Sequence, residues 1–162
     1  MLFKQTRIGK NGHPFTIYKL RSIPKGASQP NAWGIFLRKT KWDELPQLFN
    51  LLKGEMTLVG PRPDVPGYAD LLQGDDRIIL TVKPGITGLA SLKYRDEEQL
   101  LTQQPHPKQY NDEVIWPDKV RINKWYVQNR TLIMDLKIIF YTLVPIPFDV
   151  DRFMQGEKVT RD

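Results

Sequence analysis

The stretch KTKWDELPQLFNLLKGEMTLVGPRP, residues 39–63, decides the fold expected for this chain. Within it, Leu45, Leu48, Phe49 and Leu52 are spaced as on one face of a helix, and Lys53-Gly54 is a typical helix end. Residues 57–59 form a short apolar run that stops at Gly60-Pro61-Arg62-Pro63, where two prolines impose an extended backbone. The stretch therefore predicts an amphipathic helix, a short apolar segment and a rigid loop that carries an arginine.

The segments on either side extend this pattern. Pro14–Leu20 alternates apolar and polar residues and predicts a strand, and Asn11-Gly12 before it is typical of a hairpin turn. Lys83–Gly88 predicts a turn-rich loop in which the glycines meet backbone requirements. Pro117 is suited to the first position of a long helix over residues 118–143. The fold class expected is α+β, mainly helical with a few short strands.

Length and composition limit the class of protein further. The 162 residues predict a single domain, 1–162, and 40% hydrophobic with 26% charged residues is typical of a folded domain. The apolar run 138–148 is too short to span a membrane, which takes about 20 apolar residues. The net charge of +6 favours an anionic partner: nucleic acid, phospholipid headgroups or a phosphorylated metabolite.

Cysteine and histidine usage limits the chemistry. The chain has no cysteine, which excludes disulfides, thiolate catalysis and cysteine-ligated zinc. With two histidines, a site built from several histidines is also excluded. Any metal is therefore expected to be a hard cation with oxygen ligands, Mg²⁺ first.

The pair Asp43-Glu44 at the start of the predicted helix has two interpretations. In the structural one, Thr40 and Asp43 resemble a capping box and Glu44 complements the helix dipole. In the functional one, a phosphate docks at the helix N-terminus, Asp43 attacks phosphorus to form an acyl-phosphate, and Glu44 holds Mg²⁺. Helix-capping preferences alone favour the structural interpretation, and the functional interpretation stays open.

Basic residues near this pair fit the functional interpretation. Arg38 and Lys41 lie close to Asp43 in sequence and are expected to neutralise a phosphate and keep Asp43 ionised. Arg62 follows one helix and one short segment later, so the chain can fold back and bring it near the helix start, where its guanidinium suits bidentate phosphate binding.

Three further charged residues stand out. Lys19 and Arg21 flank the end of the first predicted strand, where a solvated edge is the default. Asp135 lies among apolar residues of the last predicted helix, and it either faces solvent or pairs inward.

Four segments together resemble a known family, the bacterial sugar transferases, which are monotopic polyprenyl-phosphate phosphoglycosyl transferases of surface-glycan assembly. The segments are RIGKNGHPFTIYKLRSI (7–23), FLRKTKWDELPQLFNLLKGEMTLVGPRP (36–63), VKPGITGLAS (82–91) and YVQNRTLIMDLKIIF (126–140). The resemblance runs from about Phe3 to Leu143, and its most specific part is the DELPQL, KGEM and VGPRP block.

The resemblance implies a reaction and roles for individual residues. A UDP-sugar gives its phosphosugar to a polyprenyl phosphate, yielding polyprenyl diphosphate sugar and UMP by a ping-pong route. Asp43 is implied as the nucleophile that carries the phosphosugar, and Glu44 as the Mg²⁺ ligand. The implied substrate-binding residues are Arg38, Pro61, Arg62, Lys19, Arg21, Arg95 and Asp135, the last as active-site support.

The sequence departs from the family in two places. It begins at Met1 inside the part that resembles the catalytic domain, so we expect it to lack the family's N-terminal re-entrant membrane helix. After Gly88, many members have a tryptophan and a Gln-x-Asn-Gly-Arg run; here Leu89–Tyr94 differs and Arg95 keeps its spacing. We expect this difference to affect the choice of donor sugar.

The resemblance also implies a location. We expect the intact protein to lie on the cytoplasmic face of a bacterial inner membrane, where anionic lipid attracts basic residues by about 1 kcal/mol each. This chain alone, which has no spanning segment, is expected to be soluble or peripheral.

Two other functions compete with the enzyme. A non-catalytic domain of the same fold would bind a nucleotide sugar or a partner protein, but the intact Asp43-Glu44 pair with Arg38 and Arg62 argues against it. A basic nucleic-acid-binding domain would stack bases on its aromatic residues, yet no motif of that kind is present, so no nucleic-acid partner is expected.

Overall fold

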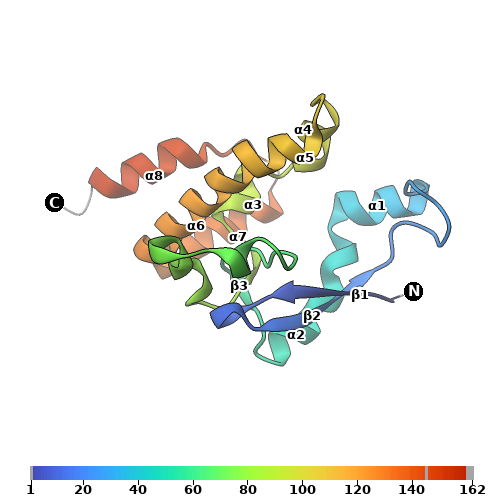
Figure 1. Cartoon of the computed structure of the whole chain (residues 1–162), viewed down its shortest axis with the longest axis horizontal. Coiled ribbons are helices and arrows are strands. Elements are labelled where there is room, and N and C mark those ends of the chain that lie inside the picture. The colour runs from blue at the N-terminus through green and yellow to red at the C-terminus, as the bar shows by residue number, and fades with distance from the viewer. Residues whose placement is uncertain (1, 145, 160–162) are drawn as a thin grey trace.

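The computed structural model describes residues 2–144 and 146–159, with side chains to residue 156 (Figure 1). Met1, Pro145 and residues 160–162, which belong to the expected domain 1–162 and in part to the apolar run 138–148, lie outside the described residues.

The described chain opens with an antiparallel hairpin. Strands β1 (Leu2–Ile8) and β2 (Pro14–Leu20) pair in register from Leu2 opposite Leu20 to Ile8 opposite Pro14. Asn11 and Gly12 take positive φ values of 58° and 78°, as a tight hairpin turn requires. The strand predicted over Pro14–Leu20 and the turn before it are confirmed. Strand β1 was not predicted, because its sequence LFKQTRI lacks a strong apolar pattern.

The helix predicted around residues 45–52 is divided into a 3₁₀ helix and a short α-helix, and another α-helix precedes them where none was predicted. Helix α1 (Ala32–Thr40) ends at Lys41, whose left-handed φ of 59° turns the chain into the 3₁₀ helix η2 (Trp42–Gln47), followed by α2 (Leu48–Leu52). The predicted capping box is wrong, because the Thr40 hydroxyl donates to the Phe36 carbonyl at 2.8 Å and so belongs to the end of α1.

A small parallel sheet brings two sequence motifs together. Strand β3 (Thr57–Val59) forms at the short apolar run, for which no strand was predicted, and its partner β4 (Gly85–Thr87) lies where a loop was expected. A Cβ added at Gly85 would lie 2.2 Å from the Gly60 nitrogen, and one at Gly88 would lie 2.2 Å from the Gly60 oxygen. The glycines are therefore backbone requirements, as predicted, because the two segments approach too closely for side chains.

Helices make up most of the remaining chain. They are the 3₁₀ helices η3 (Ala69–Leu71) and η4 (Gly74–Leu80), the α-helices α3 (Leu89–Lys93), α4 (Glu97–Thr102) and α5 (Pro107–Tyr110), the π-helical segment η5 (Asn111–Ile115), and α6 (Trp116–Asn129), α7 (Leu132–Leu143) and α8 (Val150–Val159). The long helix predicted after Pro117 is two helices, α6 and α7, because Thr131 is extended and its side chain accepts a hydrogen bond from the Met134 amide at 3.1 Å.

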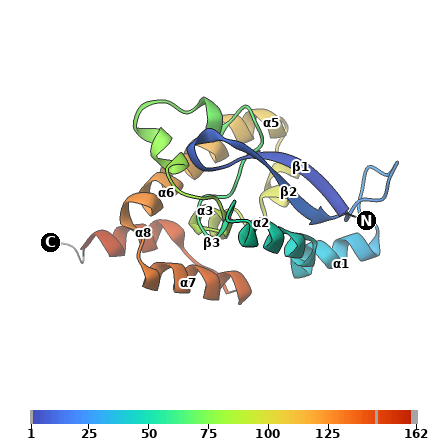
Figure 2. The same cartoon turned by 90° about the horizontal axis from the view of Figure 1, so that it is seen from below.

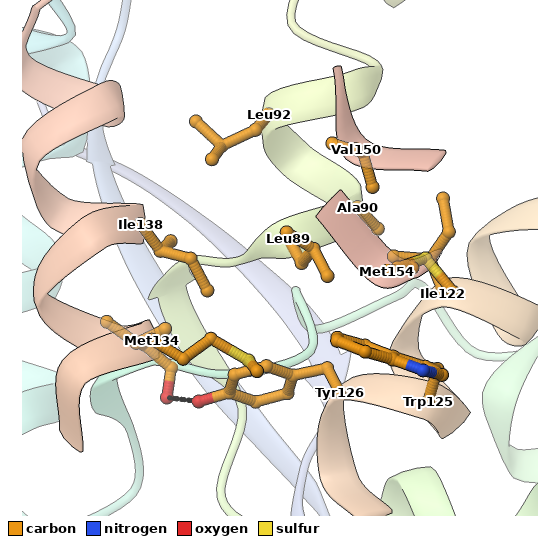
Figure 3. Packing of buried hydrophobic residues seen from close by; sticks show 11 residues of the cluster. Leu89, Ala90, Leu92, Ile122, Trp125, Tyr126, Met134, Ile138, Val150 and Met154 are labelled. Atoms are coloured by element: carbon orange, nitrogen blue, oxygen red, sulfur yellow. Dashed lines mark hydrogen bonds between the residues drawn. The ribbon is translucent and has the colours of Figure 1, made fainter. Parts of the chain in front are cut away.

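The main core lies among α3, α6, α7 and α8 (Figure 3). Its fully buried side chains include Leu89, Ile122, Tyr126, Met134, Ile138 and Val150. A second cluster of Ile8, Ala69, Ile79 and Leu80 joins the hairpin to η3 and η4. The fold is thus mainly helical α+β with a few short strands, as predicted.

Three helices leave large apolar side chains in solvent along one side of the molecule. In Figure 2, α1, α2 and α7 follow the lower edge, while the hairpin lies above them. We call their exposed residues, with those of η2, the apolar face: Trp33, Ile35, Phe36, Trp42, Leu45, Leu48, Phe49, Leu52, Leu132, Ile133, Leu136, Phe140 and Leu143. Among the described residues, no helix combines the length and apolarity needed to cross a bilayer.

Candidate active site

Glu44 is the electrostatic centre of the site. Its Oε1 accepts from Lys19 Nζ at 3.2 Å and also from the guanidinium of Arg62, so strand β2, η2 and the GPRP loop meet at one carboxylate. Burial by itself would raise the pKa of Glu44, but the charges of Arg62 and Lys19 outweigh it and lower the pKa to about 2. Arg62 therefore folds back to the start of the helical segment, as predicted.

Asp43, beside Glu44, lies in a different environment. Its side chain is half-buried, and its Oδ1 is shielded from solvent without a hydrogen-bond partner among the described residues. Burial, and then the neighbouring Glu44 charge, raise the pKa of Asp43. The charges of Lys19 and Lys41 lower the pKa of Asp43, as expected of basic residues, but burial and Glu44 outweigh them.

The loop that carries Arg62 is fixed by its neighbours. Pro61 is buried, and its carbonyl accepts from the Gly85 amide at 2.9 Å, which ties the loop to β4. Pro63 is also buried, whereas the Arg62 side chain remains 43% exposed. The prolines thus hold the backbone and leave the guanidinium available at the surface of a cavity.

Two cavities adjoin Glu44. One, of about 650 Å³, is lined by Asp43 and by several basic residues from β2, α1 and the loop after β2; we call it the basic cavity. The other, of about 530 Å³, is lined by Arg62, Arg95 and many leucines; we call it the apolar cavity. Lys41, Glu44 and Glu98 line both.

Arg38 and Arg21 face the basic cavity, as does Lys19. Arg38 Nη1 contacts both carboxylate oxygens of Glu98, at 2.6 and 2.9 Å, and its Nε donates to the Ser22 hydroxyl at 3.0 Å. The Arg21 guanidinium lies 5.5 Å from the centre of the Phe3 ring, and its buried Nε has no hydrogen-bond partner among the described residues. Lys19, Arg21 and Arg38 are thus brought to the same cavity as Asp43.

Arg95 and Asp135 are placed differently. Arg95 lines the apolar cavity and donates to the Tyr141 carbonyl near the end of α7. Asp135 accepts a hydrogen bond from the Tyr126 hydroxyl at 2.6 Å and is paired inward, against the main core. Neither Asp135 nor Pro61 lines either of these two cavities.

Several residues that sequence reasoning missed also line the apolar cavity. Burial raises the pKa of Asp64 to about 6, although Lys119 and Arg7 oppose this shift. Lys119 donates to Glu97 at 2.6 Å, and Glu98 pairs with Arg38 across 60 positions of the sequence. No spacing rule relates residues so far apart, but the charge density of residues 95–98 (RDEE) was a usable signal.

The carboxylates of Asp43 and Glu44 fit a Mg²⁺ ion that is shared with substrate phosphates. Among the described residues, no three acidic or histidine side chains gather as a cage for a metal. Mg²⁺ in proteins is commonly held by one or two carboxylates together with substrate phosphates. The adjacent Asp43 and Glu44, with the unpartnered Oδ1 of Asp43, match that arrangement rather than a metal held by protein alone.

Fold and site together define an α+β domain with an acidic pair between a basic and an apolar cavity, next to an exposed apolar face. The family model described as "Bacterial sugar transferase" matches residues 1–148. The chain belongs to the bacterial sugar transferase family.

Similar proteins carry related names. The chain is 37% identical to "Uncharacterized sugar transferase EpsL" of Bacillus subtilis, over 88% of this chain and 68% of that protein. It is 34% identical to "Undecaprenyl-phosphate galactose phosphotransferase" of Salmonella typhimurium, over 87% of this chain and 32% of that protein. It is 36% identical to "UDP-glucose:undecaprenyl-phosphate glucose-1-phosphate transferase" of Klebsiella pneumoniae, over 88% of this chain and 32% of that protein. The match thus spans about a third of the length of the last two.

Proposed function

We propose that this chain transfers a phosphosugar from a UDP-sugar to a polyprenyl phosphate, giving a polyprenyl diphosphate sugar and UMP. The observation that carries the proposal is the unpartnered Oδ1 of Asp43, which borders a basic cavity beside the Glu44, Lys19 and Arg62 cluster. The names of the relatives, which pair a UDP-sugar or a sugar phosphate with undecaprenyl phosphate, support this substrate class.

In the first half-reaction, Asp43 acts as the nucleophile. A carboxylate oxygen attacks the phosphorus that bears the sugar, an acyl-phosphate bond forms, and the bond to the other phosphate breaks with its electron pair on UMP. No hydrogen bond from the described residues occupies Asp43 Oδ1, so its lone pairs are free for this attack. Because the pKa of Asp43 is raised, the reactive ionised form is favoured by rising pH.

In the second half-reaction, an oxygen of the polyprenyl phosphate attacks the same phosphorus, and the bond to Asp43 breaks to regenerate the carboxylate. Arg62 and Lys19, already held by Glu44, would stabilise the negative charge of the phosphates. Mg²⁺, bound through Glu44 and substrate phosphates, would supply further charge neutralisation.

We also propose that the apolar face rests on an anionic membrane. Exposed apolar surface of this extent is typical of an interaction site, and α1 carries basic residues Arg38 and Lys39 in its last turn. For the intact protein this membrane would be the cytoplasmic face of a bacterial inner membrane, where the UDP-sugar and the lipid phosphate meet.

The test is intact mass spectrometry after incubation with Mg²⁺ and a panel of UDP-sugars, without lipid. We expect release of UMP and a gain of one phosphosugar mass, lost in Asp43→Asn. Glu113→Gln, on the exposed surface of η5, is the matched control and should keep the adduct.

An adduct that persists in Asp43→Asn would contradict Asp43 as the nucleophile. Unchanged UDP-sugar binding by Asp43→Asn, with no turnover or adduct in the folded wild-type chain, would favour a non-catalytic binding domain.

A further inference from the structure

We infer that the two cavities take different substrates: the basic cavity binds the nucleotide diphosphate sugar, and the apolar cavity binds the phosphate and first isoprene units of the polyprenyl phosphate. This inference rests on the proposed function and adds to it a location for each substrate.

Charge distinguishes the basic cavity. Lys19, Arg21, Lys25, Arg38 and Lys41 line it and outnumber the acidic residues Asp43, Glu44 and Glu98. The buried Nε of Arg21, without a partner among the described residues, is a hydrogen-bond donor that an anionic ligand could satisfy. The diphosphate of a nucleotide diphosphate sugar carries two permanent negative charges, and the molecule has no hydrocarbon tail. The cavity with the cationic excess therefore suits the donor.

The apolar cavity has no such excess. Its basic residues Lys41, Arg62, Arg95 and Lys119 are matched by Glu44, Asp64, Glu97 and Glu98. Most of its remaining wall is apolar, including Ile86, Leu92, Leu101 and Trp116. A ligand with one charged group and a long hydrocarbon chain is complementary to a wall of this kind.

The apolar cavity is also continuous with the apolar face. Leu45, Leu48 and Leu143 line the cavity and are 51%, 46% and 77% exposed. They come from η2, α2 and α7, which lie along the same edge in Figure 2. A lipid tail can therefore pass from a membrane at this face into the cavity without crossing the polar surface.

The boundary between the cavities is where the reaction would occur. Asp43 lines the basic cavity and Arg62 the apolar one, while Glu44 lines both. A phosphosugar bound to Asp43 would then sit beside Glu44, within reach of a phosphate held by Arg62 on the other side. This arrangement lets each substrate enter from its own medium, water or membrane.

The first test uses the full chain with Asp43→Asn, which is expected to bind substrates without turnover. Native mass spectrometry with UDP and water-soluble farnesyl phosphate should show both ligands bound to one chain. Mutual exclusion of the two would overturn the inference while leaving the proposed function intact. If the folded chain binds neither UDP nor farnesyl phosphate, both the inference and the proposed function are overturned.

The second test separates the half-reactions with two matched pairs of variants. Leu143→Gln should reduce the rate of transfer to farnesyl phosphate about tenfold, because the free energy of burying a leucine side chain against the lipid corresponds to a factor of about ten. The same substitution should leave the rate of adduct formation within about twofold of wild type. Leu71→Gln, exposed on η3 and outside both the apolar face and the cavity lining, should change neither step.

The opposite result is expected for the basic cavity. Lys25→Ala should slow adduct formation and leave the apparent KM for farnesyl phosphate unchanged, whereas Lys10→Ala, exposed in the turn between β1 and β2 and outside this lining, should change neither. If Leu143→Gln slows adduct formation as much as transfer, or Lys25→Ala raises the KM for farnesyl phosphate, the assignment of substrates to cavities is wrong.

Discussion

At the scale of single residues, the two adjacent carboxylates differ because they face different partners. Glu44 pairs with Lys19 and Arg62, whereas the Oδ1 of Asp43 is buried without a partner among the described residues. Lys19 and Arg62 form ion pairs with Glu44 and lower its pKa, whereas burial and the Glu44 charge raise the pKa of Asp43. The two neighbouring carboxylates therefore shift in opposite directions.

Glu44 should make stability depend on pH in a defined window. Its pKa falls from an ordinary 4.5 to about 2 on folding, so its contribution is complete above pH 4.5 and is lost as pH falls toward 2. At pH 7, Glu44→Gln should lower the free energy of unfolding by about 1–3 kcal/mol. Urea denaturation of both proteins at several pH values measures this difference, which should shrink between pH 4.5 and 3; a pH-independent difference would contradict it.

At the scale of elements, α2 is arranged with its polar side inward. Asn50 is fully buried, while Phe49 and Leu52 are exposed. The Asn50 side chain donates to the Thr16 carbonyl at 2.7 Å and to Glu55 at 2.8 Å, which ties α2 to strand β2. Polar contacts thus hold this helix to the protein and leave its apolar side for another partner.

Replacing Asn50 should therefore cost more stability than replacing its apolar neighbour. Asn50→Ala leaves the partly buried Thr16 carbonyl and Glu55 carboxylate without their donor, which typically costs about 1–3 kcal/mol. Phe49→Ala, at a side chain 64% exposed, should change the free energy of unfolding by less than about 0.5 kcal/mol. Urea denaturation tests the pair, and a larger loss in Phe49→Ala would mean that α2 is held by its apolar side.

Close backbone contact around the small sheet leads to a second prediction at this scale. A Cβ at Gly88 would lie 2.2 Å from the Gly60 oxygen, so Gly88→Ala should separate β4 from the GPRP loop and lower the melting temperature. Gly156, in α8, has nothing within 4 Å of an added Cβ, and Gly156→Ala should raise stability by up to about 1 kcal/mol. Equal effects of the two substitutions in a thermal melt would contradict this reading of the sheet.

At the scale of the whole molecule, the hydrophobic side chains of α7 are divided between the main core and the apolar face. Met134 and Ile138 of α7 are buried in the main core, whereas Leu132, Leu136 and Phe140 of the same helix are exposed. A helix with apolar residues on both sides can pack on the protein and on a lipid surface at once.

Membrane binding by the apolar face can be measured by flotation with vesicles that contain anionic lipid. The wild-type chain should float, and Phe49→Ser with Leu52→Ser should reduce the bound fraction about tenfold or more, since each buried apolar side chain contributes about 1.5–3 kcal/mol. Leu71→Ser is the matched control, because Leu71 is 68% exposed on η3 and lies outside the apolar face. Failure of the wild-type chain to float would exclude the apolar face as a membrane anchor for this chain.

The sequence alone was sufficient for the features that depend on nearby residues. Strand β2 (Pro14–Leu20) and the turn at Asn11-Gly12 follow from alternation and turn chemistry, which act within a few residues. The return of Arg62 to Glu44 was also predictable, since one short helix and strand leave the chain few other paths.

The tertiary structure decided what depends on distant partners. Burial and charge pairing are set by segments far apart in sequence: Glu98 meets Arg38 across 60 positions, and Lys19 and Arg62, from two other segments, both pair with Glu44. Periodicity shows that a helix such as α2 has an apolar side, but only packing decides whether that side meets the core or solvent. The reason is physical: backbone preferences are local, whereas desolvation and Coulomb interactions depend on the complete three-dimensional environment.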